Sequence, residues 1–462
     1  MTPEFDAAQL ARWCGGQWTE QPPTPLRGFS FDTRSLRPGD LFFALRSPAR
    51  DGHAYLQAAQ QAGAAAAMID QPDRSVPGLP CLLVPDVQEG MTALARAHRA
   101  SFRGTVVAVT GSVGKTTVKD LIGTILALAA PTTRSPANWN NHIGVPMSLL
   151  QSDPAAAFGV FEIGMNHPGE LDPLASLLRP QVGVVTRVGP VHIEAFGSVA
   201  DIAHEKAAVY RGLSETGTAI LNLDSPEAGR LRSSIAGPVV TVSGDASVDA
   251  DYHYERTVGS PDLVIRDRVA GETQVMTSSV PGGFMAENIA IAVAVCRTCG
   301  IGYDPIREGV AQFHPQGMRW RRETVAGVDV INDAYNANPV SMTAAIRAFL
   351  EEFTRGGRWT VLGGMLELGD QSEAAHRDLG AWIATLPIAG LVTVGPLAQP
   401  IAEAAAATGL SRVYPEPDHA SAAACLAQHT RPGDLVLLKG SRGAALENLI
   451  PLWALQQKET WT

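Results

Sequence analysis

Between residues 106 and 117 the sequence reads Val106-Val107-Ala108-Val109-Thr110-Gly111-Ser112-Val113-Gly114-Lys115-Thr116-Thr117. The apolar residues are typical of a buried parallel strand, and the residues that follow favour a helix. A strand, a small-residue loop and a helix start leave several backbone N–H groups free to converge on an anion. We expect Lys115 to reach the terminal phosphates of a nucleotide and the Thr116 hydroxyl to coordinate its magnesium. A turn that binds no ligand is the alternative.

The loop departs from the common spacing in one place. Such loops usually have a glycine where this chain has Val109, so the sequence predicts a shortened phosphate loop.

Length, composition and charge indicate a globular protein of several domains. The 462 residues exceed one ordinary core and predict about three domains. Hydrophobic residues make up 45% of the chain and charged residues 18%, which excludes a disordered protein. The net charge of −10, without a lysine- or arginine-rich block, argues against nucleic acid as the main partner.

The N-terminal residues and the hydropathy of the sequence predict neither a signal peptide nor a membrane span. Residues 1–10 include acidic residues and no apolar core, unlike a signal peptide, and no run of about 18 apolar residues predicts a membrane span. Cys296 and Cys299 form a C-x-x-C within an apolar segment and without a nearby histidine, so we interpret them as buried helical thiols and not as zinc ligands. We therefore expect a cytoplasmic protein.

The chain divides into three α/β blocks. We predict domains at residues 1–103, 104–316 and 317–462, with a hinge at the Pro315 to Gly317 turn. The first block combines alanine-rich helices such as 56–62 with short strands, at 41–45 and 81–84.

Alternating apolar and helical stretches in the second block predict a mostly parallel sheet. Its expected elements are strands at 106–110, 160–163, 182–185 and 219–223, a helix at 199–210, an antiparallel excursion or sheet edge at 239–279 and a helix at 286–299. The third block predicts a Rossmann-like α/β sheet with strands at 328–331, 359–362, 391–394 and 435–438.

Polar residues follow the strands of the second block, where open parallel sheets place ligands. Glu162 follows one strand, and His192 comes just after another. Each alone has an ordinary alternative, a helix cap for the acid and a loop hydrogen bond for the histidine. Together with the Lys115 loop they predict a magnesium site. Lys206 follows on a helix, where spacing alone favours a solvent-facing side chain.

Two further loops could contact a ligand. The amide-rich segment around Asn140 and Asn141 is suited to specific hydrogen bonds, although a plain turn cluster would look similar. In the third block, Arg319 and the loop 332–339 suit the ribose and phosphates of a nucleotide, and the segment 439–443 could clamp a carboxylate. Ordinary loop chemistry at strand ends is the alternative for both.

These motifs, in this order, resemble the Mur ligases, the ATP-dependent amide-forming enzymes of peptidoglycan precursor synthesis. The resemblance covers nearly the whole chain and is most specific in Tyr335-Asn336-Ala337-Asn338-Pro339 and Met365-Leu366-Glu367-Leu368-Gly369. These two motifs resemble those of one branch of the family, whose members add D-alanyl-D-alanine to UDP-N-acetylmuramoyl-tripeptide. The resemblance implies three domains: a UDP-substrate domain, a central ATP-binding domain and a C-terminal Rossmann-like domain. It also implies a monomer.

The resemblance assigns roles to particular residues. It implies ATP binding by Thr110, Gly111, Ser112, Val113, Gly114, Lys115, Thr116, Thr117, Asn288, Arg319, Asp333 and Asn336. It implies substrate binding by Thr33, Arg34, Ser35, Asn140, Asn141, Ser441 and Arg442. Two magnesium ions would be held around Thr116, Glu162, His192 and Lys206, with Lys115, His192 and Lys206 catalytic. In this family, the lysine with which Lys206 aligns reacts with CO₂ to become a carbamate. The resemblance therefore replaces the interpretation from spacing, a solvent-facing lysine, by a residue of the metal site.

The sequence departs from the family pattern at four places. The segment 46–50 lacks a frequent glycine and aromatic pattern, Phe284 and Met285 replace a common His-Asn pair, Gly364 replaces a frequent acid, and Asn332 replaces a common aspartate. Two alternative functions stay open at this point: a related ligase with another amine acceptor, and a nucleotide-binding homologue without ligase activity.

Overall fold

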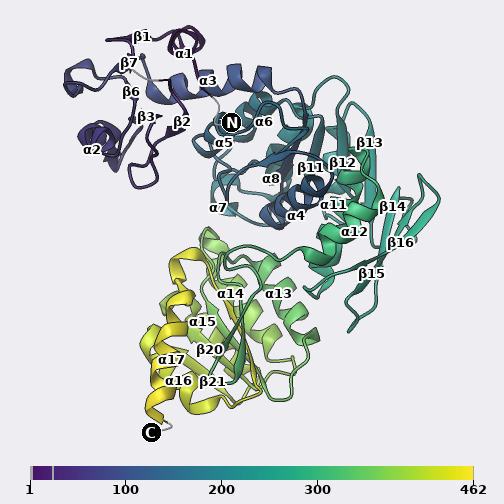
Figure 1. Cartoon of the computed structure of the whole chain (residues 1–462). Coiled ribbons are helices and arrows are strands. Elements are labelled where there is room, and N and C mark those ends of the chain that lie inside the picture. The colour runs from purple at the N-terminus through teal and green to yellow at the C-terminus, as the bar shows by residue number, and fades with distance from the viewer. Residues whose placement is uncertain (1–3, 23–24, 461–462) are drawn as a thin grey trace.

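The computed structural model describes residues 4–22 and 25–460, which form three α/β units in chain order (Figure 1). The first unit is purple in Figure 1, the central unit is blue to green, and the C-terminal unit is green to yellow. Each unit has its own sheet, and this confirms the predicted fold class. Met1, Thr2 and Pro3 of the acidic N-terminal segment lie outside the described residues.

The first unit has a sheet of five short strands in the order β1-β7-β6-β3-β2, parallel except for β1. Its long helix α3 begins after Asp86, whose side chain accepts the Glu89 N–H at 2.8 Å. This helix is fastened to the central unit, because His98 Nε2 donates to the Ser152 carbonyl at 3.0 Å. The elements are α1 Ala7–Cys14, β1 Gln17–Trp18, β2 Gly28–Ser30, β3 Asp40–Phe43, β4 Arg46–Ser47, β5 Arg50–Asp51, α2 Leu56–Gln61, β6 Ala66–Ile69, β7 Cys81–Leu83 and α3 Val87–Ser101.

The central unit has a nine-stranded sheet in the order β16-β15-β14-β13-β12-β11-β8-β10-β9. It is parallel from β9 to β14, so β13, which begins the stretch predicted as an antiparallel excursion, is a parallel strand. Only β14, β15 and β16 pair antiparallel, at one edge of the sheet. Its strands are β8 Thr105–Thr110, β9 Thr132–Arg134, β10 Phe158–Glu162, β11 Val182–Val185, β12 Thr218–Asn222, β13 Val239–Ser243, β14 Tyr252–Arg256, β15 Asp262–Asp267 and β16 Glu272–Thr277. Its helices are α4 Lys115–Ala129, α5 Gly144–Leu150, α6 Leu171–Leu178, α7 Ile193–Phe196, α8 Val199–Lys206, α9 Ala208–Arg211, α10 Ala228–Ser233, α11 Gly283–Thr298 and α12 Tyr303–Gln312.

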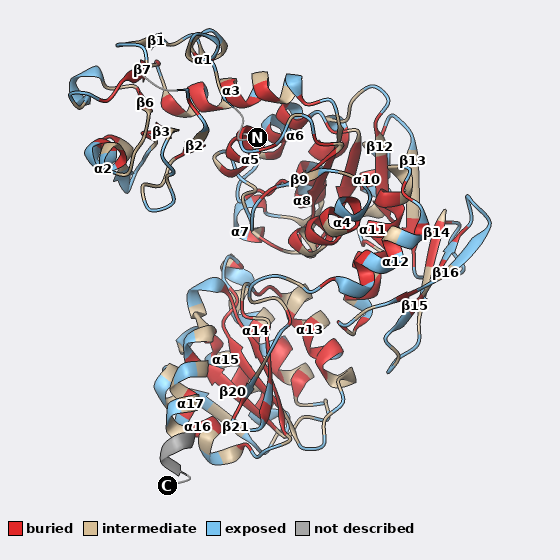
Figure 2. Ribbon diagram, viewed as in Figure 1, coloured by how far each residue is buried: buried red, intermediate tan, exposed pale blue. Residues whose placement is uncertain are grey.

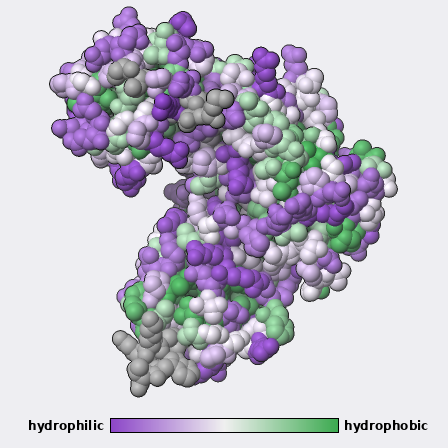
Figure 3. All heavy atoms as spheres, viewed as in Figure 1, coloured by the Kyte–Doolittle hydropathy of each residue, from purple (hydrophilic) through white to green (hydrophobic). Residues whose placement is uncertain are grey.

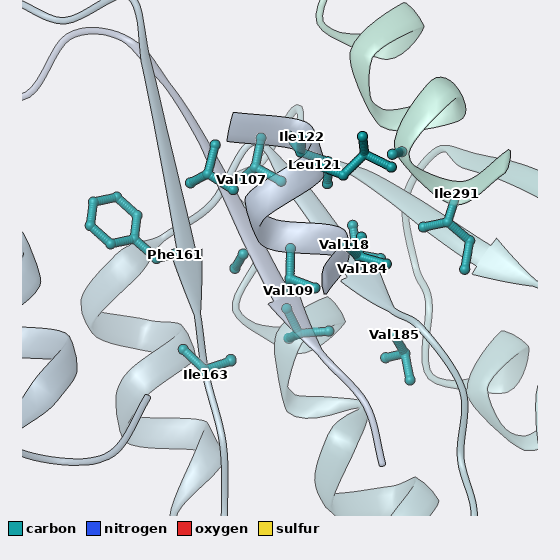
Figure 4. Packing of buried hydrophobic residues seen from close by; sticks show 14 of the residues in the cluster. Val107, Val109, Val118, Leu121, Ile122, Phe161, Ile163, Val184, Val185 and Ile291 are labelled. Carbon is teal, nitrogen blue, oxygen red and sulfur yellow. The ribbon is translucent and has the colours of Figure 1, made fainter. Parts of the chain in front are cut away.

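Strand β8 is central because it lies between β10 and β11 and carries apolar side chains on both faces (Figure 4). Val107 and Val109 are fully buried, as are Leu121 of α4 and Ile291 of α11. Burial of a Val, Leu or Ile side chain contributes about 1.5–3 kcal/mol each. The register pairs Glu162 with Val109 and therefore brings the carboxyl ends of β8 and β10 to one edge.

Two predicted helices differ in detail. The helix expected at 199–210 is two helices, because the Ala207 N–H is shared between the Ala203 and Glu205 carbonyls and the turn tightens there. Cys296 is buried in α11 as predicted, but Cys299 is only half-buried at the end of that helix. Burial raises the pKa of the Cys299 thiol to about 12, so it stays protonated at neutral pH.

The C-terminal unit has a six-stranded sheet in the order β17-β18-β22-β19-β20-β21, parallel except for β17. The antiparallel strand β17 and the edge strand β21 were not predicted from the sequence. The strands are β17 Arg321–Val325, β18 Val328–Asn332, β19 Arg358–Gly363, β20 Gly390–Val394, β21 Val413–Glu416 and β22 Leu435–Lys439. The helices are α13 Pro339–Glu351, α14 Ser372–Ile383, α15 Gln399–Ala407, α16 His419–His429 and α17 Leu449–Thr460.

Buried residues concentrate in the sheets and on the helix faces that cover them (Figure 2), and the largest hydrophobic cluster includes residues from all three units. In the part of the chain that the structure describes, no helix has the length and apolarity that crossing a bilayer requires.

Candidate active site

A cleft of about 1090 Å³ lies between the central and C-terminal units. Most residues predicted for the site line it: Ser112, Val113, Gly114, Lys115, Thr116, Thr117, Asn140, Asn141, Glu162, His192, Asn288, Arg319, Asp333, Asn336 and Arg442. Thr110, Gly111, Lys206 and Ser441 lie behind this lining, and Thr33, Arg34 and Ser35 are elsewhere, on the first unit. In the space-filling view the molecule is indented between its upper and lower parts (Figure 3).

The loop between β8 and α4 has the backbone geometry of a phosphate loop. Gly114 has φ +83° at the start of α4, a conformation that favours glycine. A Cβ on Gly111 would lie 2.0 Å from Thr186 Oγ1, so only glycine fits there. The Lys115 ammonium donates to the Gly111 carbonyl at 2.7 Å and thus folds back over the loop. The N-terminus of α4 therefore faces the cleft with a lysine beside it.

Glu162 has one carboxylate oxygen paired and one unpaired. Its Oε1 accepts a hydrogen bond from Asn140 Nδ2 at 2.7 Å, whereas its buried Oε2 has no hydrogen-bond partner in the described chain. An unpaired buried carboxylate oxygen is costly, and a cation would offset that cost. Thr116 follows Lys115 in the first turn of α4. Its hydroxyl oxygen accepts a hydrogen bond from the Arg319 guanidinium at 3.2 Å.

These residues fit a magnesium ion that is bound together with phosphate. Within residues 4–22 and 25–460, no three His, Cys, Asp or Glu side chains cluster as a ready-made metal cage. Mg²⁺ is usually held by one or two protein groups, by water and by the phosphates of its nucleotide. A carboxylate and a hydroxyl beside a phosphate loop are suited to this second mode of binding.

Lys206 is buried close to the half-buried Lys115, which lines the cleft. Lys206 is 2% exposed, so the interpretation from spacing, a solvent-facing lysine, was wrong. In the described residues its ammonium has no hydrogen-bond or ion-pair partner, while Glu205 accepts from the Gly169 and Leu171 N–H groups instead. Burial lowers the pKa of Lys206 well below its usual value, and the charge of Lys115 lowers it further. Burial also lowers the pKa of Lys115, and Glu162 opposes that shift.

His192 joins the two walls of the cleft. Its Nδ1 lies 2.5 Å from Glu367 Oε2 of the C-terminal unit. Burial lowers the pKa of His192, the Glu367 carboxylate raises it, and the two lysines lower it. The structure therefore brings Lys115, Glu162, His192 and Lys206 into one neighbourhood at the edge of the central sheet.

On the C-terminal wall the charged groups are paired. The Lys439 ammonium lies 2.7 Å from Asp333 Oδ2 and donates to the Asn336 carbonyl at 3.1 Å. The Arg319 guanidinium stacks over the Tyr335 ring at 3.8 Å. The segment 439–443 was expected to clamp a carboxylate, and in this structure the carboxylate that Lys439 binds is that of Asp333 in the same chain.

Most residues predicted to bind substrate, among them Asn140 with its bond to Glu162, have internal partners in this structure. Arg442 is paired with Glu447. The Ser441 hydroxyl accepts the Leu366 N–H at 3.0 Å and donates to the Ala337 carbonyl. Arg34 pairs with Asp32 on the surface of the first unit and holds the pKa of Asp32 at about 2. Asn141 Oδ1 accepts the N–H groups of Ile143 and Gly144, which fixes the start of α5.

The departures from the family pattern have local structural reasons. Phe284 packs on Trp320 with ring centroids 5.7 Å apart, at the junction of the two units. A side chain on Gly364 would meet Leu397 at 2.5 Å. Asn332 donates to Glu323 at 3.3 Å, where an aspartate would place two carboxylates together. In the segment 46–50, Arg46 pairs with Asp70 at 3.0 Å.

Sequence reasoning missed several residues of the cleft. Arg187 donates to Glu287 at 3.0 Å beside the phosphate loop, and its carbonyl accepts the Ser112 N–H at 2.7 Å. The signal was its place directly after β11, at the same edge as Glu162. Glu367 was quoted within a motif but was given no role.

The sequence and the structure were compared with known proteins. Residues 109–296 match the Mur ligase middle domain, and residues 318–442 match the Mur ligase, glutamate ligase domain. The UDP-N-acetylmuramoyl-tripeptide--D-alanyl-D-alanine ligase of Bacillus subtilis is 33% identical over 92% of this chain and 93% of its own. The enzyme of that name from Escherichia coli is 32% identical over 94% and 95%.

Solved structures agree with these relatives. A crystal structure of MurF from Acinetobacter baumannii has a TM-score of 0.88 and 27% identity over 98% of this chain and 99% of its own. MurF ligase from Thermotoga maritima in complex with ADP has a TM-score of 0.81 and 26% identity over 94% and 99%. The chain therefore belongs to the Mur ligase family.

Proposed function

We propose that this protein is an ATP-dependent ligase that joins D-alanyl-D-alanine to UDP-N-acetylmuramoyl-tripeptide and so forms the UDP-linked pentapeptide of peptidoglycan synthesis. The relatives that carry this activity in their names match more than nine-tenths of the chain. The observation that carries the proposal is the cleft, where Lys115, Glu162 and His192 line one side and residues of the C-terminal unit line the other. The boundaries at residues 103 and 316 belong to the proposal.

The reaction joins a carboxylate and an amine, and ATP activates the carboxylate. The terminal carboxylate of the tripeptide attacks the γ-phosphorus, ADP leaves, and an acyl phosphate forms. The amine of D-alanyl-D-alanine then attacks the acyl carbon, and phosphate leaves from the tetrahedral intermediate. Both attacks bring negative or electron-rich groups together, so buried cations lower the barrier.

Each side chain of the central wall has a role in this scheme. Lys115 neutralises charge on the terminal phosphates, and the loop 110–117 holds the phosphates by its backbone N–H groups. Thr116, Glu162 and His192 are the residues that would hold magnesium, of which we propose two ions. Bound magnesium would offset phosphate charge and polarise the γ-phosphoryl group. Asn288 of the central unit and Arg319, Asp333 and Asn336 of the C-terminal wall position the rest of the nucleotide.

Lys206 would act as a carbamate and not as an ammonium. A neutral amine is the form that reacts with CO₂, and burial beside Lys115 favours that form. The amine nitrogen bonds to the CO₂ carbon and one proton is released, so the neutral amine becomes an anion. Counted from the ammonium form, two protons are released and a cation is replaced by an anion. An anion next to Lys115 would replace the repulsion between two ammonium groups by attraction and would add a ligand for the second magnesium.

We further propose that Thr33, Arg34 and Ser35 contact the UDP end of the substrate, that Asn140, Asn141, Ser441 and Arg442 contact its peptide and the dipeptide, and that the protein is a cytoplasmic monomer. Both walls of the cleft come from one chain, which supports a site that needs no second copy. The tripeptide must then extend from the first unit to the central wall.

The test is ADP release in the presence of ATP, magnesium, UDP-linked tripeptide and D-alanyl-D-alanine. We expect release that depends on both substrates and a product with the mass of the pentapeptide. L-alanine, glutamate and a diamino acid serve as alternative amines. Release that depends on one of these amines instead of the dipeptide would identify a different ligase, and no release with any amine would contradict ligase activity.

A further inference from the structure

The loop between β19 and α14 crosses the cleft and contacts the segment that carries His192. Glu367 in this loop reaches His192 Nδ1 at 2.5 Å. A Cβ on Gly369 would lie 3.3 Å from the Glu194 side chain in α7. The loop from the C-terminal unit therefore touches α7 and the residue before it at two points.

Both partners of this contact have an unusual backbone conformation. Glu367 has φ +63° and His192 has φ +54°, in the left-handed region that residues other than glycine seldom adopt. Such conformations persist where the surrounding structure enforces them, and they cluster at functional sites. Two of them face each other across the boundary between the units.

A buried histidine fixes the loop from behind. The Met365 N–H donates to His376 Nε2 at 2.8 Å, and His376 Nδ1 lies 2.6 Å from the Ser372 carbonyl. Since the Met365 amide is a donor, Nε2 accepts and the ring proton is on Nδ1, from which it is donated to Ser372. The His376 ring is fully buried, and its burial lowers its pKa, so the neutral form that can accept this bond is favoured.

We propose that Glu367 and His376 are positioning residues of the ligation reaction: His376 fixes the loop backbone, and Glu367 thereby orients the His192 imidazole from the opposite domain. The part of this inference that concerns catalysis rests on the proposed function, whereas the contact itself does not. A histidine that binds a metal through one nitrogen usually donates its other N–H to a carboxylate, which fixes the ring. Glu367 supplies such a carboxylate only when the two units are together.

Orientation, and not stability, is the use that this ion pair can have. The Glu367 side chain is 57% exposed, and an ion pair with an exposed carboxylate contributes little to folding. Loss of Glu367 should therefore leave the protein folded and affect the step in which His192 takes part.

Steady-state kinetics test the catalytic part. Glu367→Ala should lower kcat by about 10–100-fold with an unchanged KM for the UDP-linked tripeptide, because removal of such an outer partner typically costs that much. His376→Asn cannot reach Met365 and should lower kcat likewise, whereas the amide oxygen of His376→Gln reaches about as far as Nε2 and should restore most of it. The Glu367→Ala/His376→Asn double variant should be no slower than the slower single variant, because both changes break one connection.

Two matched controls separate this role from general damage. Glu255→Ala removes a carboxylate of similar exposure, which pairs with Arg266 at 2.6 Å outside the cleft. His98→Gln alters another buried histidine that bonds a carbonyl, Ser152, at 3.0 Å. Both controls should keep the wild-type kcat.

Hydrogen–deuterium exchange of the protein without ligands is the second readout. Glu367→Ala and His376→Asn should speed exchange in residues 188–197, and the two controls should not. An unchanged kcat in Glu367→Ala, or unchanged exchange at 188–197 in both variants, would overturn the inference. If the wild-type protein releases no ADP with any substrate, the proposed function fails, and the exchange comparison still decides whether the loop holds His192.

Discussion

The charged side chains on the two walls of the cleft differ in whether they have partners within the protein. On the central wall, the Lys206 ammonium and Glu162 Oε2 are buried without a partner among the described residues. On the C-terminal wall, Lys439 is paired with Asp333, and Arg319 stacks on Tyr335. One wall therefore lacks countercharges that the other already has.

This difference indicates which wall is completed by ligands. A buried charge without a partner lowers stability, whereas a paired one is compensated within the protein. We infer that phosphate, magnesium and a carbamate provide the countercharges of the central wall, and that the C-terminal wall is a preformed surface. Substitutions on the two walls should then change stability in opposite directions.

The largest expected effect is that of Lys206→Met. Turnover should fall by about 10³-fold or more, because a group that stabilises the charge of the transition state is lost. The free energy of unfolding should rise by about 1–3 kcal/mol, because an apolar side chain replaces a buried amine that has no hydrogen-bond partner among the described residues. ADP release and urea denaturation measure the two quantities, and ATP binding should be retained. A stable variant with normal turnover would contradict the role of Lys206.

On the opposite wall, Lys439→Met should lower the free energy of unfolding by about 2 kcal/mol, because the half-buried Asp333 carboxylate loses its cation and keeps only the hydrogen bond from the Trp320 N–H. Urea denaturation measures the loss. The Lys439→Met/Asp333→Leu double variant is the control, and it should recover most of that stability. If Lys439→Met stabilised the protein as Lys206→Met does, the contrast between the walls would be wrong.

Ligand binding should act mainly on the central wall. MgATP at one hundred times its Kd should raise the free energy of unfolding by about 2.7 kcal/mol. Chelation of magnesium, or Glu162→Gln at the same ATP concentration, should remove most of this gain, because Glu162 Oε2 loses its cation. Thermal melts with ATP, with and without EDTA, measure this effect. Equal stabilisation of wild type and Glu162→Gln would exclude Glu162 as a metal ligand.

The smallest effect concerns the buried histidines outside the cleft. Burial lowers the pKa of His98 from 6.5, so the unfolded chain binds its proton more readily. The contribution of neutral His98 to stability is therefore complete above pH 6.5 and is lost as pH falls toward the folded-state pKa. Below pH 6.5, the free energy of unfolding should change less steeply with pH in His98→Gln than in the wild-type protein. The difference between the two slopes should be at most about 1.4 kcal/mol per pH unit. Denaturation at several pH values measures this slope, and an unchanged slope would contradict it.

Much of the central wall could be predicted from local sequence. The run 106–117 combines a strand pattern, two glycines and a lysine-threonine pair, and each feature alone restricts the backbone. Glu162 could be placed at the same edge because parallel strands end together, and the register of β8 and β10 agrees. The antiparallel excursion and the third sheet also followed from apolar periodicity.

Features that depend on contacts between distant segments could not be predicted. Lys206 is the last residue of α8 and is buried where this helix packs against α6, α7, α9 and α10, while helix periodicity alone favours an exposed lysine. The Glu367–His192 contact joins two units and two rare backbone conformations, and neither leaves a local signal. Strand β17 is short and rich in arginine, so it lacks the apolar pattern of its neighbours.

Transfer of oxygen from the peptide to phosphate tests the central claim most directly. The tripeptide is prepared with ¹⁸O in its terminal carboxylate and incubated with ATP, magnesium and D-alanyl-D-alanine. If that carboxylate attacks the γ-phosphorus, each inorganic phosphate released should carry one labelled oxygen, visible by mass spectrometry. Pentapeptide formed alongside unlabelled phosphate would contradict an acyl phosphate route.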